Sequence, residues 1–444
     1  MHNPLEREIT LPFLLRFTMP SMVMMVIMSL YTVVDGIFVS RLIGTDAFSA
    51  VNIVYPLLSV TIALGTMFGT GLTAIVSRKL GEGKEQEARR DLSFVVLVAL
   101  FLGMAVTVVS YLLLPVLIRG LGADAGIYQD CWDYALPLVA FFTPSILQCL
   151  FQTLYVANGK PAIGLVVTIL GGLTNVILDY VFIAECHWGI AGAAIATGLG
   201  YAVPTVFGFV YFGFYRKDSL YFVRPGVHWQ TLLQTVANGS SEMVTNLSTS
   251  VTTLLFNLIM MRLLGSDGVA AISILLYLDF VLVAVSLGYS LGAAPLISYN
   301  YGRGDTDRLR RLFQLSASFC AVIGLAVTVG AKVFARQLAG IFTPSGTPVY
   351  ELAVVGLGIY AFGYLFKGYN VFASALFTAF GNGLISAILS FARTLVFLVV
   401  SLLGLSALFG LDGVWFSLPA AEAMAFALSL FFTLRYRRLY HYAD

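Results

Sequence analysis

The chain alternates long apolar stretches with short polar ones. Pro20–Ser40 carries a single charged residue, Asp35, and Leu92–Ile118 carries none. About 20 apolar residues cross a bilayer as a helix. We predict an all-α integral membrane protein with twelve transmembrane helices. They cover approximately residues 14–40, 52–77, 92–118, 132–157, 161–184, 190–214, 229–262, 270–298, 312–340, 350–380, 383–408 and 413–434.

Composition narrows the class further. Apolar residues make up 59% of the chain and charged residues 11%, whereas soluble proteins have about 45–50% and about 25%. A soluble globular protein is therefore excluded. A transmembrane β-barrel is also excluded, because its strands would be short segments of alternating hydrophobicity.

The second half of the chain repeats the first at an offset of 221 residues. RLIGTDAFSA, which begins at Arg41, returns as RLLGSDGVAA from Arg262, and GLTAIVSRKLGEG from Gly71 returns as GAAPLISYNYGRG from Gly292. A third match pairs the segments that begin at Gly189 and Gly410. We predict two pseudo-symmetric six-helix lobes, residues 1–214 and 229–444, joined by a linker at 215–228. Substrate passes between the halves in transporters built this way.

Positive charge is distributed unevenly between the two sides of the membrane. Of the 25 Arg and Lys residues, two fall within spans (Lys367 and Arg393) and five fall on one side (Arg41, Arg119, Arg262, Lys332 and Arg336). The remaining ones lie on the side that holds both termini. Because cytoplasmic loops are enriched in Lys and Arg, we predict a multi-pass protein of the plasma (inner) membrane with both termini in the cytoplasm.

Polar side chains of the first lobe fall at one depth. Asp35 lies six residues before Arg41, Asp179 lies six before Glu185, and Thr197 lies eight after Gly189. These separations correspond to about 9–12 Å below the outer boundary, at 1.5 Å per residue. Asn175 and Asp179 are four residues apart and share a helical face. The second copy has Phe256 opposite Asp35 and Leu418 opposite Thr197, so the fold does not require polar groups there.

Two carboxylates, an amide and a hydroxyl at membrane depth suit cation coupling. A buried carboxyl group takes up a proton more readily than an exposed one, and the same oxygens can ligate Na⁺. We predict an H⁺ or Na⁺ site at Asp35, Asn175, Asp179 and Thr197. The alternative is a structural hydrogen-bond network, because Asn and Thr often bond across membrane helices.

The second lobe contains further charged or polar residues within its spans, and charged groups at that depth need partners. Asp279 could pair with Lys367 or Arg393, or these groups could line a hydrated cavity. Direct coupling is a third reading. The candidates for this charge network are Glu242, Asp279, Lys367, Asn370, Arg393 and Glu422. Gln148 and Gln152 of the fourth span are further candidates for the cleft.

These features together resemble the multidrug and toxic compound extrusion (MATE) family, in its bacterial MepA-like branch. The residues that carry the resemblance are Pro20 and Asp35, the RLIGTD turn, and Asn175 with Asp179. It implies export of amphipathic, often cationic, compounds in exchange for H⁺ or Na⁺ by alternating access, with a first helix that bends near Pro20. The second lobe departs from the family pattern, because span ten has Lys367 and Asn370 but no carboxylate.

Other functions fit less well. A lipid-linked oligosaccharide flippase of the same superfamily would have more spans and a more cationic cavity. A membrane-embedded enzyme would need a loop-borne His/Asp or metal cluster, and a structural or receptor-like protein leaves the acids of the first lobe unexplained. The sequence has no GxxxxGK[ST] loop for ATP. We expect a monomer in the lipid bilayer that is not an enzyme, has no cofactor besides the coupling ion, and binds small molecules but no nucleic acid.

Overall fold

The computed structural model describes residues 4–43, 45–123 and 125–442, and in this range the side chains of residues 32–42, 45–46 and 48 are outside the description. Every regular element of the described part is a helix. The α-helices are α1 (Leu11–Leu42), α2 (Thr45–Gly81), α3 (Glu85–Gly120), α4 (Tyr128–Val139), α5 (Phe142–Ala157), α6 (Pro161–Asp179), α7 (Gly189–Phe214), α8 (Trp229–Arg303), α9 (Thr306–Val333), α10 (Ala335–Gly340), α11 (Pro348–Tyr360), α12 (Tyr364–Ala379), α13 (Gly383–Phe391), α14 (Leu398–Phe409) and α15 (Leu411–Tyr436). Short 3₁₀ or π turns are η1 (Pro4–Glu6), η2 (Tyr180–Glu185), η3 (Ala361–Gly363) and η4 (Ala392–Phe397).

The helices confirm the predicted spans. Ten helical segments of the described chain are long and apolar enough to cross a membrane, and α4 with α5, bent by 56°, forms an eleventh. Helix α8 has 75 residues and is broken at Gly265, where φ is 67° and ψ is −146°. Only glycine adopts such a conformation readily. The break lies in the RLLGSDG segment that the sequence predicts as a turn, so α8 contains two spans and the described part of the chain holds twelve.

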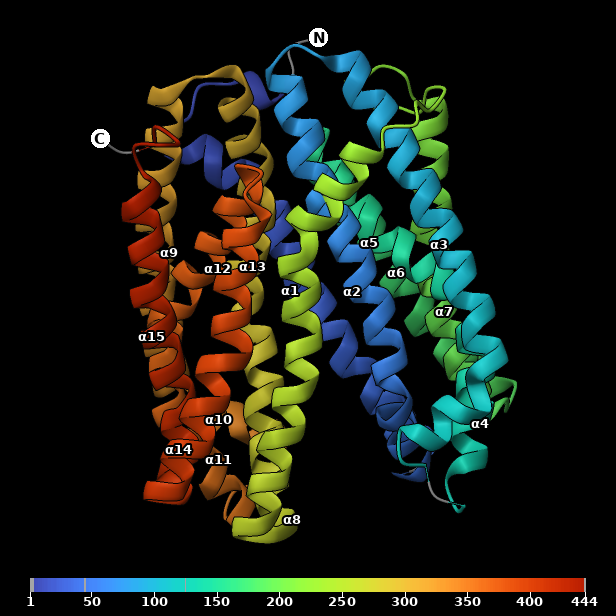
Figure 1. The fold of residues 1–444 in the computed structure, drawn as a ribbon. Coiled ribbons are helices and arrows are strands. Elements are labelled where there is room, and N and C mark those ends of the chain that lie inside the picture. Colours follow the sequence, from blue (N-terminus) through green and yellow to red (C-terminus); the bar gives the residue numbers. More distant parts are fainter. Residues whose placement is uncertain (1–3, 44, 124, 443–444) are drawn as a thin grey trace.

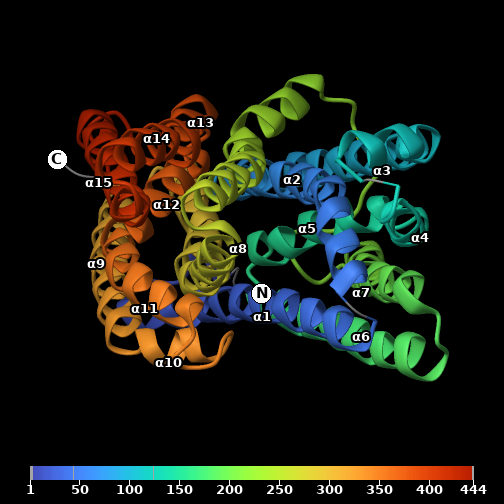
Figure 2. The same ribbon diagram turned by 90° about the horizontal axis from the view of Figure 1, so that it is seen from below.

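The helices form two bundles. Helices α2–α7 lie on one side and α9–α15 on the other, and both ends of the chain lie at the same end of the molecule (Figure 1). Seen along the bundles, α1 and α8 lie between the two groups (Figure 2). Helix α1 packs against both α8 and α6. The first helix therefore contacts both α6 of the first bundle and the long helix α8, and the predicted lobe boundaries stay a prediction.

The bundles meet closely at the end that holds the termini. A Cβ atom on Gly81 would overlap the carbonyl of Tyr299, and one on Gly302 would overlap the carbonyl of Arg78. A second pair of glycines, Gly71 and Gly239, packs against the backbone of Thr235 and Met67. Small residues allow helix backbones to approach in membranes. We call these four contacts between α2 and α8 the glycine seam.

A buried polar cluster fixes the linker at the same end. Asp91 of α3 is fully buried. Its carboxylate lies 2.5 Å from Lys79 Nζ and 2.9 Å from His228 Nδ1, and Thr231 Oγ1 lies 3.3 Å away. Asp91 and Lys79 precede the linker and Thr231 follows it, so the Asp91 cluster connects the first bundle to the start of α8.

Candidate functional site

The polar residues predicted in the first lobe lie together on α6 and α7. Asn175, Asp179 and Thr197 are all buried. Asn175 Nδ2 donates to Thr197 Oγ1 over 3.4 Å, so α6 and α7 meet at these two residues. Asp179 ends α6 one turn beyond Asn175, where the π-turn η2 begins. π-Turns inside helices occur frequently at functional sites.

Glycines bring α6 and α7 close enough for this contact. A Cβ on Gly200 would lie 3.0 Å from the Cβ of Asn175, and one on Gly171 would lie 2.7 Å from the Gly200 carbonyl oxygen. The Asn175 side chain therefore lies against bare backbone. Its Oδ1 atom is buried and accepts no hydrogen bond from the described residues. Buried acceptors are nearly always satisfied in proteins, so this oxygen is available to a proton donor or a cation.

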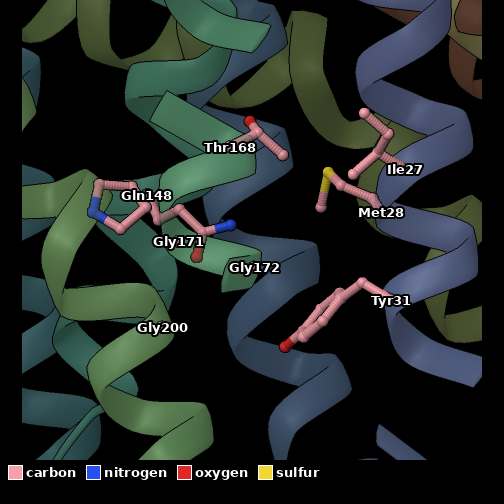
Figure 3. Close-up of a pocket in the computed structure, with 9 residues that line it drawn as sticks. Ile27, Met28, Tyr31, Gln148, Thr168, Gly171, Gly172 and Gly200 are labelled. Atoms are coloured by element: carbon pink, nitrogen blue, oxygen red, sulfur yellow. The ribbon is translucent and has the colours of Figure 1, made fainter. Parts of the chain in front are cut away.

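A pocket opens one turn from this pair, between α1, α5, α6 and α7. It encloses about 340 Å³ including the part open to solvent. Met28 and Tyr31 point from α1 across the space toward the side chains of α5 and α6 (Figure 3). The residues that line it are Ile27, Met28, Tyr31, Gln148, Thr168, Gly171, Gly172, Gly200 and Pro204.

Both glutamines of α5 reach this region. Gln148 lines the pocket, and its buried Oε1 accepts no hydrogen bond from the described residues. Gln152 Nε2 donates to Thr168 Oγ1 at 3.0 Å and lies 3.6 Å from Met28 Sδ. The pocket thus offers an amide group on one wall and flexible or aromatic apolar groups on the other. Apolar walls with a few polar groups are typical of small-molecule sites.

Two predicted site residues belong to α1. The side chain of Asp35 lies outside the described residues, so its part in the site stays a prediction. Pro20 lies within α1, which runs continuously from Leu11 to Leu42. The bend near Pro20 also stays a prediction, because only one conformation is described.

The second bundle pairs most of its interior charges. Lys367 Nζ contacts both carboxylate oxygens of Asp279, at 2.8 and 2.7 Å, which confirms one of the two pairings considered. Arg393 pairs instead with Glu422 of α15, at 3.3 Å. Asn370 Nδ2 donates to Glu422 Oε2 at 2.7 Å. Glu242 is half-buried and makes no ion pair among the described residues.

Sequence reasoning missed other residues of the pocket. Thr168, Gly171 and Gly200 line it, and nothing in their own spacing distinguishes them from packing residues. One signal was available for Thr168: it lies seven residues before Asn175, and two helical turns preserve the face. The Asp91 cluster was also missed, although Asp91 directly follows the repeated basic segment that ends at Arg90.

Twelve membrane-spanning helices in two bundles, with a buried acid beside a pocket, define a transporter-type helical membrane protein. The MatE family model matches residues 20–181 and 243–403, in both halves of the chain. The chain belongs to the MatE family.

Curated relatives and solved structures are similar over nearly the whole chain. The multidrug export protein MepA of Staphylococcus haemolyticus is 25% identical over 96% of this chain and 94% of its own length. MepA of a Staphylococcus aureus strain is 22% identical over 94% and 92%. The outward-facing structure of a multidrug resistance MATE family transporter superposes with a TM-score of 0.91 at 23% identity, covering 96% of each chain. A MATE structure in complex with MaL6 gives the same values.

Proposed function

We propose that this protein is a secondary multidrug exporter, which expels amphipathic, often cationic, compounds in exchange for H⁺ or Na⁺. The observation that carries the proposal is the position of Asp179. It is buried at membrane depth, one turn from the Asn175–Thr197 pair and near the pocket between α1 and α7. The relatives named as multidrug export proteins match the chain over almost its entire length.

The oxygen atoms of this site fit either coupling ion. Hard cations prefer oxygen ligands. This site offers a carboxylate, a hydroxyl and the Asn175 Oδ1 atom, which accepts no hydrogen bond from described residues. Asp179 and Asp35 can equally well carry a proton. Cation entry would change the net charge between α1 and α6 and so the packing of α1 against its neighbours. Because α1 contacts both α6 and α8, such a change can reach the pocket and the interface with α8.

The glycine seam defines the direction of access in this proposal. The positive charge of the loops favours cytoplasmic termini. The seam lies at that end, because Tyr299 donates to Glu6 near the N-terminus and Tyr301 packs against Tyr440 near the C-terminus. The cytoplasmic end is then closed, and the conformation corresponds to the outward-facing state. The likeness to an outward-facing transporter structure supports this assignment.

The test is efflux of a fluorescent cation from energised membrane vesicles. We expect Asp179→Asn and Asp35→Asn to abolish efflux at normal expression. Glu185→Gln is the matched control, because Glu185 is six residues beyond Asp179 and exposed; it should transport like the wild type. Vesicles with only a pH gradient or only a sodium gradient identify the coupling ion. Wild-type efflux by both aspartate variants would exclude the coupling role.

A further inference from the structure

The segment before α1, residues 4–9, is packed against the rest of the protein. Leu5 is 0% exposed and Ile9 is 1% exposed, whereas Arg7 and Glu8 between them are exposed. Both apolar side chains belong to the same buried core as residues of α2 and of α9. Burial of apolar side chains is favourable, so it holds this segment in place. We call residues 4–9 the N-terminal strap.

One end of the strap lies on the first bundle. The Pro4 ring packs against Gly159, in the turn between α5 and α6, where an added Cβ would be 3.0 Å from Pro4 Cγ. Gly159 has a φ of 71°, a conformation that glycine adopts readily. Because it has no side chain, the ring lies directly on the backbone of the turn. The strap therefore contacts the first bundle through apolar packing.

Hydrogen bonds attach the strap to the second bundle and to α8. The Arg308 guanidinium of α9 donates to the Glu6 carbonyl oxygen at 3.0 Å, and Tyr299 Oη of α8 donates to Glu6 Oε1 at 3.1 Å. Asp305 orients the guanidinium, because its Oδ2 atom lies 3.2 Å from Arg308 Nε. Hydrogen bonds with an ionised partner are stronger than those between neutral groups. Glu6 is therefore held through both its backbone and its side chain.

Tyr299 connects the strap to the glycine seam. Its hydroxyl group donates to Glu6, while its backbone carbonyl is the group that a Cβ on Gly81 of α2 would overlap. The strap and the seam thus meet at one residue of α8. The strap also contacts both bundles, so separation of the bundles at this end must break its contacts with one of them.

We propose that the N-terminal strap holds the seam end of the protein closed, and that Glu6 is the positioning residue that fixes it there. The inference rests on the proposed export function, and it adds a regulated closure to the alternating-access cycle. The strap is followed by α1, which begins at Leu11 and lines the pocket through Met28 and Tyr31. A change in α1 can therefore reach the strap along the chain. The seam end opens only when the strap releases one bundle.

Distances between spin labels on the purified protein test this role without requiring transport. The labels are attached at Gln86→Cys near the start of α3 and Gln314→Cys in α9, two exposed positions on different bundles. Cys186→Ser removes the exposed native cysteine from this background. Separation of the bundles at the seam end lengthens the distance between the two labels. The fraction of molecules with the long distance then measures the open form.

Glu6→Ala should raise the fraction of the open form about threefold to tenfold, as expected for the loss of one hydrogen bond. Glu8→Ala is the matched control, because Glu8 is exposed on the same segment; it should keep the wild-type distribution. Leu5→Ser removes a buried anchor and should favour the open form at least as strongly. Tyr299→Phe should act like Glu6→Ala, and combining the two should add nothing, because both remove the same hydrogen bond.

Three results would overturn the assignment. The first is an unchanged distance distribution in both Glu6→Ala and Leu5→Ser, and the second is an equal shift in Glu8→Ala. The third is a lower melting temperature of Glu6→Ala with unchanged distances, which would mean a purely structural role. Asp179→Asn separates this inference from the export proposal, which expects loss of ion-driven efflux. In that background, Glu6→Ala should still favour the open form.

Discussion

Gly81 and Gly302 are equivalent positions of the two sequence repeats, and each lies against the backbone of the other repeat. Gly81 contacts the carbonyl of Tyr299, and Gly302 contacts the carbonyl of Arg78. Tyr299 and Arg78 are themselves equivalent, since they are also 221 residues apart. The contact is therefore made twice, once in each direction. This is the relationship expected of a pseudo-two-fold axis between parallel repeats.

Substitution in this seam should open it. We expect Gly302→Ala to destabilise the described conformation by about 1–3 kcal/mol, because an added methyl group overlaps backbone that cannot move aside. Thermal unfolding of the purified protein measures the change. Gly404→Ala is the control, because a Cβ there meets nothing within 4 Å. Equal melting temperatures for the two variants would contradict tight packing at the seam.

Two adjacent glycines of the pocket should respond differently to the same change. A Cβ on Gly171 would lie 2.7 Å from the Gly200 carbonyl oxygen and 2.8 Å from Pro204 Cγ, whereas one on Gly172 meets nothing within 4 Å. Gly171→Ala should push α7 from α6, lower stability by about 1–3 kcal/mol and reduce efflux. Gly172→Ala should leave stability equal or raise it by up to about 1 kcal/mol. Melting curves and efflux rates for the pair decide this, and a milder effect at Gly171 would refute it.

The ion pair between Asp279 and Lys367 should show strong non-additivity. The two side chains are 19% and 11% exposed, so removing one partner leaves a poorly solvated charge. We expect Lys367→Met to cost about 2–3 kcal/mol, less than the 3–5 kcal/mol of a fully buried pair. Lys367→Met combined with Asp279→Leu should cost less than Lys367→Met alone. Thermal unfolding of the single and double variants tests this, and additive losses would count against a paired role.

The Asp91 cluster should control access of proteases to the end of the linker. Asp91 binds His228 and Thr231 on the far side of the linker, while Tyr211 and Lys160 hold Asp218 at its start. Asp91→Asn should therefore speed chymotryptic cleavage after the exposed Trp229, at the end of the linker, several-fold. Cleavage after the exposed Tyr215, at the start of the linker, should change little and serves as an internal control. Equal acceleration at both sites would indicate general unfolding instead.

Most of the architecture could be predicted from the sequence repeat. The repeat includes glycines at equivalent positions, and these mark backbone conformations that other residues rarely adopt. Gly83 and Gly304 both have positive φ, 76° and 73°, and so do Gly189 and Gly410, at 60° and 57°. The contact between Asn175 and Thr197 was predictable because both positions count from the same membrane boundary. Counting residues along each helix from that boundary gives the depth of a side chain in the membrane. Asn175 and Thr197 have similar depths by this count, which is why we expected them at one level.

The rotation of each helix about its axis and the partner of each interior charge could not be predicted from the sequence. From their positions along the sequence, Arg393 and Lys367 could each pair with any of the interior acids. Arg393 pairs with Glu422 because α15 packs against η4. Histidine 228 seemed an isolated loop residue, yet the fold brings it to Asp91, 137 residues earlier. The pocket is made by four helices from different parts of the first half, so its lining depends on interhelical angles that the local pattern does not encode.

The glycine seam has one further consequence, for how the carrier avoids leaks. At most helix interfaces, side chains change conformation as the helices separate and so keep part of the contact. The glycines of the seam have no side chain that could do this. Separation by about 1 Å already forfeits a quarter to a half of each atomic contact. The closure that the glycine seam makes between α2 and α8 therefore has no stable partly open form. We expect it to be either fully closed or fully open, which leaves no narrow opening through which ions could leak.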